Sequence, residues 1–179
     1  MKISVIGLGY VGLPLFLELS KNFMVQGFDH DSIRVNELKR GFDRNDNTNN
    51  LKLKKKNNLI SNNFSSLINS NVFIITLPTP INKKNHPDIK NIINITNKLS
   101  KIIKKDDLII YESTFYPGLT EEILIPILEK GSNLICRYEK ISIKNKIKKH
   151  PFYIVKTLIE QTDKMFDAFM DAEFIQGKN

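Results

Sequence analysis

The chain is 179 residues long, and 41% of its residues are hydrophobic, which is enough to form the core of one globular domain. Lysine and arginine number 27 against 19 acidic residues, giving a formal net charge of +8. This charge does not predict a nucleic-acid binder, because the lysines are scattered and no aromatic residues interleave with them as stacking platforms. No run of about eighteen apolar residues occurs, so we expect neither nucleic acid nor a membrane as a partner.

The single cysteine, Cys136, excludes an internal disulfide and fits a reducing compartment. The chain opens with Met1-Lys-Ile-Ser and runs directly into an apolar strand, without the pattern of a secretory signal peptide. We therefore expect a cytoplasmic protein with a single domain over residues 1–179. No metal site is expected, and the sequence does not indicate an oligomeric state.

The start of the chain has the order strand, glycine-rich turn, helix, strand and acidic residue. An apolar run over residues 3–6 ends at Gly7, and Gly9 and Gly12 complete the pattern G-x-G-x-x-G. An apolar helix and a second apolar run follow, and that run ends at Asp29. A glycine turn can serve packing alone, but here the strand, the helix and the acid all agree with a dinucleotide-binding unit.

Each part of this unit has a physical task. Gly7 permits the tight turn, Gly9 lets a pyrophosphate approach the backbone, and Gly12 lets the helix pack closely on the strand. The pyrophosphate would lie on free N–H groups at the positive end of the helix dipole. Asp29 would accept hydrogen bonds from ribose hydroxyls and favours NAD over NADP, because a carboxylate repels a 2′-phosphate. Arg34 argues mildly for NADP, although an exposed position on the next helix is the simpler interpretation.

Residues 31–40 predict that next helix, with Asp31 or Ser32 as its N-cap and Gly41 as its C-cap. Its apolar face is expected to consist of Ile33, Val35 and Leu38. Residues 42–63 are polar and low in complexity, which predicts a loop with a short helical piece.

Residues 72–77 are apolar throughout, as expected for a parallel strand that is covered on both faces. Pro78-Thr79-Pro80 ends this strand and leaves the Thr79 hydroxyl at the carboxyl end of the sheet, where ligands bind in doubly wound folds. Thr79 is equally well interpreted as a turn residue. A helix is predicted from Pro87 to about residue 103.

A further strand is predicted over residues 107–111, with a helix that continues to about residue 130. Ser113 and Thr114 follow this strand, in the same position relative to the sheet as Thr79. Strands and helices alternate, and each connection is long enough to cross over. The pattern therefore predicts an α/β fold, a Rossmann-like doubly wound parallel sheet in three α/β/α layers. The glycine turn and the two threonine loops are expected to converge on one edge of the sheet.

Together these motifs resemble the UDP-glucose/GDP-mannose dehydrogenase family. The resemblance rests on Lys2-Ile-Ser-Val-Ile-Gly-Leu-Gly-Tyr-Val-Gly-Leu-Pro, Gly27-Phe-Asp29 with Arg34, Pro78-Thr-Pro with Pro87-Asp88, and Glu112-Ser-Thr-Phe-Tyr-Pro-Gly with Glu121-Glu122. It covers residues 1 to about 130. The Tyr116-Pro117-Gly118 segment is most similar to the branch that acts on UDP-N-acetylhexosamines for surface polysaccharides.

The resemblance implies an oxidoreductase that oxidises the C6 alcohol of a UDP-sugar to the uronic acid, with NAD as the oxidant. It implies that the pyrophosphate turn consists of Gly7, Gly9, Tyr10, Val11 and Gly12. It also assigns Asp29 and Arg34 to the adenosine ribose, Thr79 to a cofactor contact, and Thr114 to the position beside the nicotinamide.

Beyond residue 130 the resemblance decays. Residues 134–141 are only weakly similar to the family's next strand, and shorter than it. The pattern of residues 164–175 predicts an amphipathic helix. We expect these 179 residues to lack the family's central domain and sugar-binding domain, and Cys136 lacks the sequence context of the family's nucleophilic cysteine. We expect residues 131–179 to be a degenerate end of the domain. We also expect the chain alone to be inactive, with a UDP-sugar bound only if the missing domains are supplied.

Three alternative hypotheses are compatible with parts of this pattern. The chain could be a non-catalytic NAD-binding module or the remnant of a longer gene. It could also be a Rossmann dehydrogenase of the 3-hydroxyacid type, a class that shares the glycine turn and the Ser-Thr loop but not Pro78-Thr-Pro with Tyr116-Pro-Gly.

Overall fold

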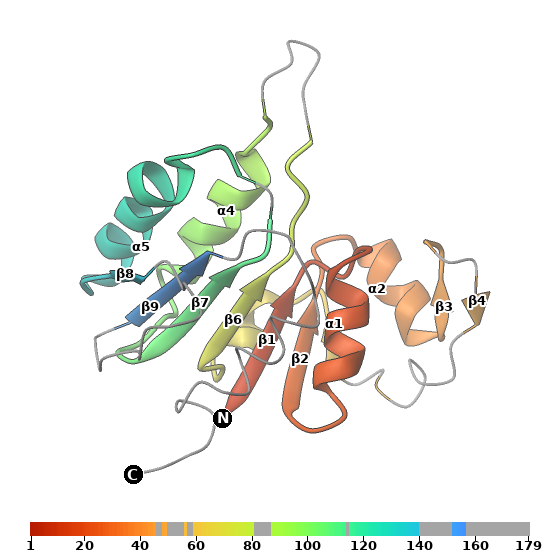
Figure 1. Ribbon diagram of the computed structural model, residues 1–179. Coiled ribbons are helices and arrows are strands. Elements are labelled where there is room, and N and C mark those ends of the chain that lie inside the picture. The colour runs from red at the N-terminus through yellow and green to blue at the C-terminus, as the bar shows by residue number, and fades with distance from the viewer. Residues whose placement is uncertain are drawn as a thin grey trace.

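A seven-stranded sheet forms the centre of the structure (Figure 1). Its strand order is β5-β2-β1-β6-β7-β9-β8, and all its pairings are parallel. Its strands are β1 (Lys2–Ile6), β2 (Met24–Phe28), β5 (Ile60–Ser61), β6 (Val72–Ile75), β7 (Asp107–Tyr111), β8 (Arg137–Glu139) and β9 (Phe152–Lys156). The computed structural model describes residues 1–45, 48–49, 56, 59–80, 87–113, 115–139 and 152–156.

The register of the central strands aligns their carboxyl ends. Ile6 at the end of β1 pairs with Phe28 of β2 on one side and with Ile75 of β6 on the other. Ile75 pairs in turn with Tyr111, the last residue of β7. The segments that follow these strands therefore leave the sheet at one edge, as predicted from the sequence.

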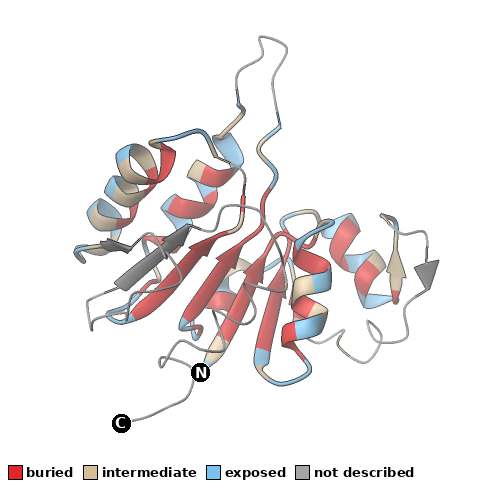
Figure 2. Ribbon diagram, in the orientation of Figure 1, coloured by how far each residue is buried: buried red, intermediate tan, exposed pale blue. Residues whose placement is uncertain are grey.

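Helices cover both faces of the sheet, which confirms the doubly wound prediction. One core lies between the sheet and the helices α1 (Gly12–Leu19) and α2 (Ser32–Lys39), and the other lies under α4 (Lys90–Leu99) and α5 (Ile125–Ser132). Successive residues of β7 alternate between these cores, since Leu108 and Ile110 join the first and Ile109 and Tyr111 the second. The central strands are accordingly buried along almost their whole length (Figure 2).

The ends of α2 agree with the sequence, but its buried side does not. The Asp31 carboxylate accepts a hydrogen bond from the Ile33 N–H at 2.8 Å, and Gly41 follows the helix with a φ of +84°. Ile33 was expected in the core and is 65% exposed, so that prediction is wrong. The inward side of the helix consists of Arg34, Val35 and Leu38. The charged residue Arg34 thus lies on the buried side of α2, where hydrophobic periodicity predicts an apolar residue.

Residues 42–63 contain more structure than the predicted loop. Strand β3 (Phe42–Asp43) pairs antiparallel with β4 (Thr48–Asn49) in a separate two-stranded sheet. Strand β5 then extends the main sheet beside β2, and Ile60 is buried there. Strands of two residues contain too few positions for hydrophobic alternation to be recognised, so the sequence could not reveal them. A 3₁₀ turn, η2 (Phe64–Leu67), leads from β5 to β6.

The later elements follow the predicted order with shifted boundaries. Helix α4 begins at Lys90 and not at Pro87, and the Asp88 carboxylate accepts a hydrogen bond from the Lys90 N–H at 3.1 Å at this start. A π-helical turn, η3 (Leu119–Leu124), precedes α5, after Gly118 with a φ of +94°. Strand β9 lies between β7 and β8, an order that the sequence did not indicate. The amphipathic helix predicted over residues 164–175 lies outside the described residues.

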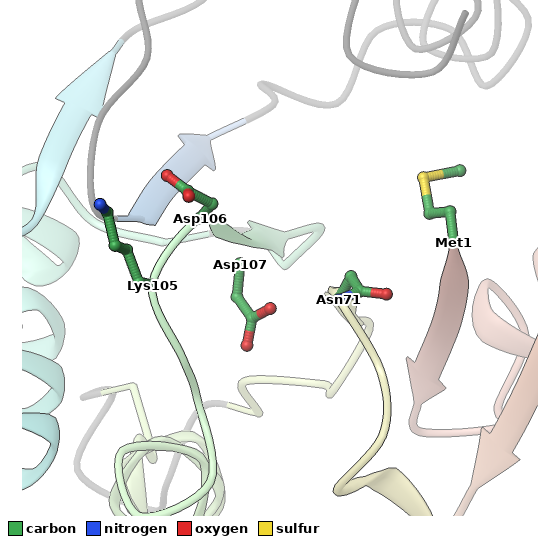
Figure 3. Close-up of a pocket in the computed structure, with 5 residues that line it drawn as sticks. All are labelled: Met1, Asn71, Lys105, Asp106 and Asp107. Atoms are coloured by element: carbon green, nitrogen blue, oxygen red, sulfur yellow. The ribbon is translucent and has the colours of Figure 1, made fainter. Parts of the chain in front are cut away.

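The amino ends of the strands enclose a hollow of about 270 Å³ (Figure 3). Its lining residues are Met1, Asn71, Lys105, Asp106 and Asp107. Asp107 opens β7, is 2% exposed, and accepts a hydrogen bond from the Lys104 N–H at 2.8 Å. Burial raises the pKa of Asp107 to about 6, and hydrogen bonds from Lys104 and Asn71 offset only part of this effect.

The raised pKa of Asp107 predicts that ionisation of this carboxyl lowers the free energy of unfolding as the pH rises. The folded-state pKa of Asp107 lies above its ordinary value of 3.8, so its contribution to stability is present below pH 3.8 and is lost as the pH rises through 6. Asp107→Asn keeps an acceptor for the Lys104 N–H but does not ionise. Relative to the parent chain, the variant should be more stabilised at pH 7.5 than at pH 5, by on the order of 1 kcal/mol. Urea unfolding of both proteins at each pH measures the difference, and a pH-independent difference would contradict the prediction.

Candidate functional site

The glycine turn at the end of β1 gives each of its glycines a different environment. Gly7 has a φ of +97°, and its N–H donates to the Phe28 carbonyl at 2.8 Å. A Cβ on Gly12 would lie 1.8 Å from the Gly7 carbonyl oxygen and 2.3 Å from the Thr76 hydroxyl, so no side chain fits there. A Cβ on Gly9 would meet nothing within 4 Å. Gly7 and Gly12 are thus required by the fold, while Gly9 faces open space that a bound group could enter.

Backbone donors face this open space. The N–H groups of Gly9, Tyr10 and Val11 make no hydrogen bond to another described residue. Helix α1 starts directly after them and has no side-chain cap and no acidic residue in its first turn. Unpaired N–H groups at the positive end of a helix form a site for an anion. The Tyr10 side chain is 78% exposed, so Tyr10 contributes to the turn through its backbone. This arrangement fits the pyrophosphate of a dinucleotide.

Asp29 lies beside the glycine turn, at the end of β2. One carboxylate oxygen accepts a hydrogen bond from the Leu8 N–H at 2.8 Å, and the other accepts one from the Asp31 N–H at 3.0 Å. The carboxylate is therefore held in one orientation by two backbone donors. A carboxylate has about four acceptor positions, so two more donors, such as ribose hydroxyls, fit the same group. The sequence placed Asp29 near the turn, and the structure adds that Asp29 helps to hold the turn.

Arg34 is buried, which overturns its interpretation as an exposed helix residue. Its Nε donates to the Leu8 carbonyl at 3.0 Å, and its Nη1 pairs with Asp43 Oδ1 at 2.7 Å. Burial of a guanidinium is tolerated when acceptors surround it, and these two supply that compensation. Asp43 was not singled out from the sequence, because it lies in an Asp-Arg-Asn-Asp stretch that is typical of a solvated loop.

Side-chain hydroxyls tie the loops at this edge together. The Thr76 hydroxyl donates to the Gly7 carbonyl at 2.7 Å, so it joins the end of β6 to the glycine turn. The Ser113 hydroxyl donates to the Leu77 carbonyl at 2.6 Å, so it joins the segment after β7 to the segment after β6. Thr76 was not identified from the sequence, because it looks like one more residue of an apolar strand.

Of the remaining residues singled out from the sequence, the structure describes Thr79 and Cys136 but not Thr114. Thr79 is half-buried between the exposed residues Pro78 and Pro80, at the predicted edge. Thr114 lies outside the described residues. Cys136 is half-buried on the second core, and burial, together with the charge of Glu129, raises the pKa of its thiol to about 12. A thiol with this pKa stays protonated near neutral pH and is a poor nucleophile.

Residues 1–157 match the model of the UDP-glucose/GDP-mannose dehydrogenase family, NAD binding domain. Over 135 residues the chain is 44% identical to the UDP-N-acetyl-D-glucosamine 6-dehydrogenase of Pseudomonas aeruginosa, a match that covers 75% of this chain and 32% of that protein. Over 134 residues it is 42% identical to Protein CapL of Staphylococcus aureus, again covering 75% and 32%. The chain thus spans about a third of the length of these relatives.

Solved structures agree with this match. The fold is similar to that of the UDP-D-ManNAc dehydrogenase from Pyrococcus horikoshii, with a TM-score of 0.71 and 25% identity over 93% of this chain and 38% of that one. It is also similar to GDP-mannose dehydrogenase from Pseudomonas aeruginosa in a ternary complex, with a TM-score of 0.69 and 20% identity over the same shares. The second likeness concerns the fold alone.

The different surroundings of Gly9 and Gly12 predict different costs for the same substitution. Gly12→Ala should lower the free energy of unfolding by about 2–3 kcal/mol or more, because the new methyl group overlaps the Gly7 backbone. Gly9→Ala should change it by less than about 1 kcal/mol, since its Cβ meets open space. Urea unfolding of the two variants beside the parent chain measures both values. Equal losses would show that the turn has another shape.

Proposed function

Because this chain belongs to the UDP-glucose/GDP-mannose dehydrogenase family and contains its NAD-binding domain, we propose that it is the cofactor half of an enzyme that oxidises the C6 alcohol of a UDP-sugar to a uronic acid. The observation that supports this proposal best is the pair of groups around Leu8. In the turn, the N–H groups of Gly9, Tyr10 and Val11 make no hydrogen bond to a described residue, and the Leu8 N–H just before them donates to the fixed Asp29 carboxylate. Together they match the pyrophosphate and the ribose of one dinucleotide.

The resemblance and the geometry together support a role for each residue of the site. The backbone of Gly7, Gly9, Tyr10, Val11 and Gly12 holds the pyrophosphate. We expect Asp29 and Arg34 to contact the adenosine ribose, and Thr79 and Thr114 to contact the cofactor on its nicotinamide side, as the resemblance implies. NAD, when bound, accepts the hydride from the alcohol carbon. The part of this chain in the reaction is therefore to bind the cofactor and to orient it at the carboxyl edge of the sheet.

The sugar and the remaining catalytic groups are a further part of the proposal. Relatives at 41–44% identity are named UDP-N-acetyl-D-glucosamine 6-dehydrogenases, which favours a UDP-N-acetylhexosamine as the substrate. Oxidation to the acid needs a nucleophile for its second step, and the raised pKa of Cys136 argues against that residue. We infer that the base and the thiol are supplied by polypeptide outside these 179 residues.

We also propose a cytoplasmic location, which the single cysteine supports. Within the described part of the chain, no helix is both long enough and apolar enough to cross a bilayer.

The cofactor proposal predicts that the purified chain binds NAD. Calorimetric titration should show saturable binding to the parent chain and binding at least about 10-fold weaker to Gly9→Ala, because a methyl group occupies the space where the pyrophosphate approaches. Urea unfolding of Gly9→Ala shows whether that variant is folded. Absence of binding to the parent chain at millimolar NAD would remove the proposal.

The substrate proposal predicts that the chain alone does not turn over. With NAD and either UDP-glucose or a UDP-N-acetylhexosamine, absorbance at the NADH maximum should not rise above the enzyme-free rate. Clear NADH formation by the purified chain would contradict the inference that the base and the thiol come from elsewhere. NAD binding without turnover even when the other domains are supplied would favour a non-catalytic NAD-binding module.

A further inference from the structure

A continuous set of contacts connects the glycine turn to the short strand β3. The N–H of Leu8 donates to Asp29, and the carbonyl of Leu8 accepts from Arg34. Arg34 in turn pairs with Asp43 in β3. Both polar groups of the Leu8 residue are therefore fixed by charged side chains, one from the end of β2 and one from α2. Asp43 is the outer end of this set and is connected to the turn through Arg34.

Asp43 neutralises a charge that water reaches poorly. The side chain of Arg34 is 6% exposed and that of Asp43 is 14% exposed. Nε of Arg34 bonds to the Leu8 carbonyl, and Nη1 bonds to Asp43. Nη2 is buried and has no hydrogen-bond partner among the described residues. Removal of the carboxylate would leave a buried cation with one fixed neutral acceptor, an arrangement that is unstable unless another anion takes its place.

The position of Asp43 is itself fixed. The same oxygen that receives Arg34 accepts a hydrogen bond from the Asn45 N–H at 3.0 Å. Asp43 also lies in the paired segment of β3, opposite Thr48 of β4. The carboxylate is thus presented to Arg34 by backbone structure, and the pairing does not depend on a flexible surface contact.

We propose that Asp43 is a positioning residue that also selects the cofactor: through Arg34 it holds the glycine turn, and it neutralises the guanidinium that would otherwise attract a 2′-phosphate. This proposal rests on the proposed function, because it takes the adenosine ribose to lie at Asp29. Arginines beside that ribose are the usual ligands of the 2′-phosphate of NADP. Here Asp29 and Arg34 bind the N–H and the carbonyl of the same residue, Leu8. The guanidinium of Arg34 is already paired with Asp43.

A second arginine, Arg44, is also paired with carboxylates, but its ion pairs are exposed to water and contribute less. Arg44 contacts Glu37 and Asp31, and its side chain is 39% exposed. Ion pairs in contact with water contribute little and are easily exchanged. Arg34 differs because it is buried and bonded to the carbonyl of Leu8, the residue whose N–H donates to Asp29. The proposal therefore concerns Asp43 and not Glu37.

Calorimetric titration of the full chain with NAD and with NADP tests the proposal. Asp43→Asn keeps an oxygen acceptor for Arg34 but removes the charge. We expect the ratio of the NADP to the NAD dissociation constant to fall by about 10-fold or more, mainly because NADP binds more tightly. Arg34→Gln removes the cation, so NAD should bind about 10-fold more weakly and NADP should not gain. Glu18→Gln is the control, since it removes the same charge from an exposed pair between Glu18 of α1 and Lys21, and its ratio should not change.

The outcomes separate this inference from the proposed function. No NAD binding by the parent chain counts against the proposed function. NAD binding by the parent chain with an unchanged ratio in Asp43→Asn, or with both affinities weakened equally, overturns the selecting role of Asp43. If circular dichroism shows that Asp43→Asn is unfolded, the double variant Arg34→Gln with Asp43→Asn leaves no unpaired cation. That variant should bind NAD about 10-fold more weakly than the parent chain, and parent-like binding would overturn the positioning role.

Discussion

The close approach of α1 to the end of β1 is the constraint on which the rest of the site depends. No Cβ fits at Gly12, because the Gly7 carbonyl and the Thr76 hydroxyl fill the space. This contact fixes where α1 starts and therefore the position of the turn before it, where the N–H groups of Gly9, Tyr10 and Val11 make no hydrogen bond to a described residue. The apolar side of α1, with Leu13, Phe16 and Leu19, then packs on the sheet and holds the helix in that place. Packing and binding are thus set by the same few atoms.

Backbone dipoles, and not basic side chains, provide the affinity for an anion at this edge. Both arginines near the turn are paired with carboxylates, Arg34 with Asp43 and Arg44 with Glu37 and Asp31. Within the described part of the chain, these two arginines near the turn are therefore not free cations, despite the net charge of +8. A neutral cradle of N–H groups with one carboxylate at its end suits a cofactor with a pyrophosphate and an unmodified ribose.

The two edges of the sheet have different physical characters. At the carboxyl edge, the Thr76 and Ser113 hydroxyls donate to the main-chain carbonyls of Gly7 and Leu77, so the glycine turn and the segments that follow β6 and β7 form one unit. At the amino edge, the buried Asp107 has a raised pKa and lies in a hollow that Met1 and Asn71 also line (Figure 3). The family match settles the choice against a 3-hydroxyacid-type enzyme. It leaves the activity of the longer relatives as a proposal for a chain about a third of their length.

Elements with local signals could be predicted from the amino-acid sequence alone. Continuous apolar runs predicted β1, β6 and β7, Asp31 and Gly41 marked the ends of α2, and the glycine spacing with Asp29 predicted the binding turn. Features that depend on distant segments became visible only in the folded chain. Burial of Arg34 is compensated by the Leu8 carbonyl and by Asp43, which belong to other segments. Strand β5 forms by pairing with β2, and β9 lies between β7 and β8. Such contacts join residues far apart in the chain, so neither periodicity nor composition encodes them, and only the folded arrangement shows which polar residues are partners.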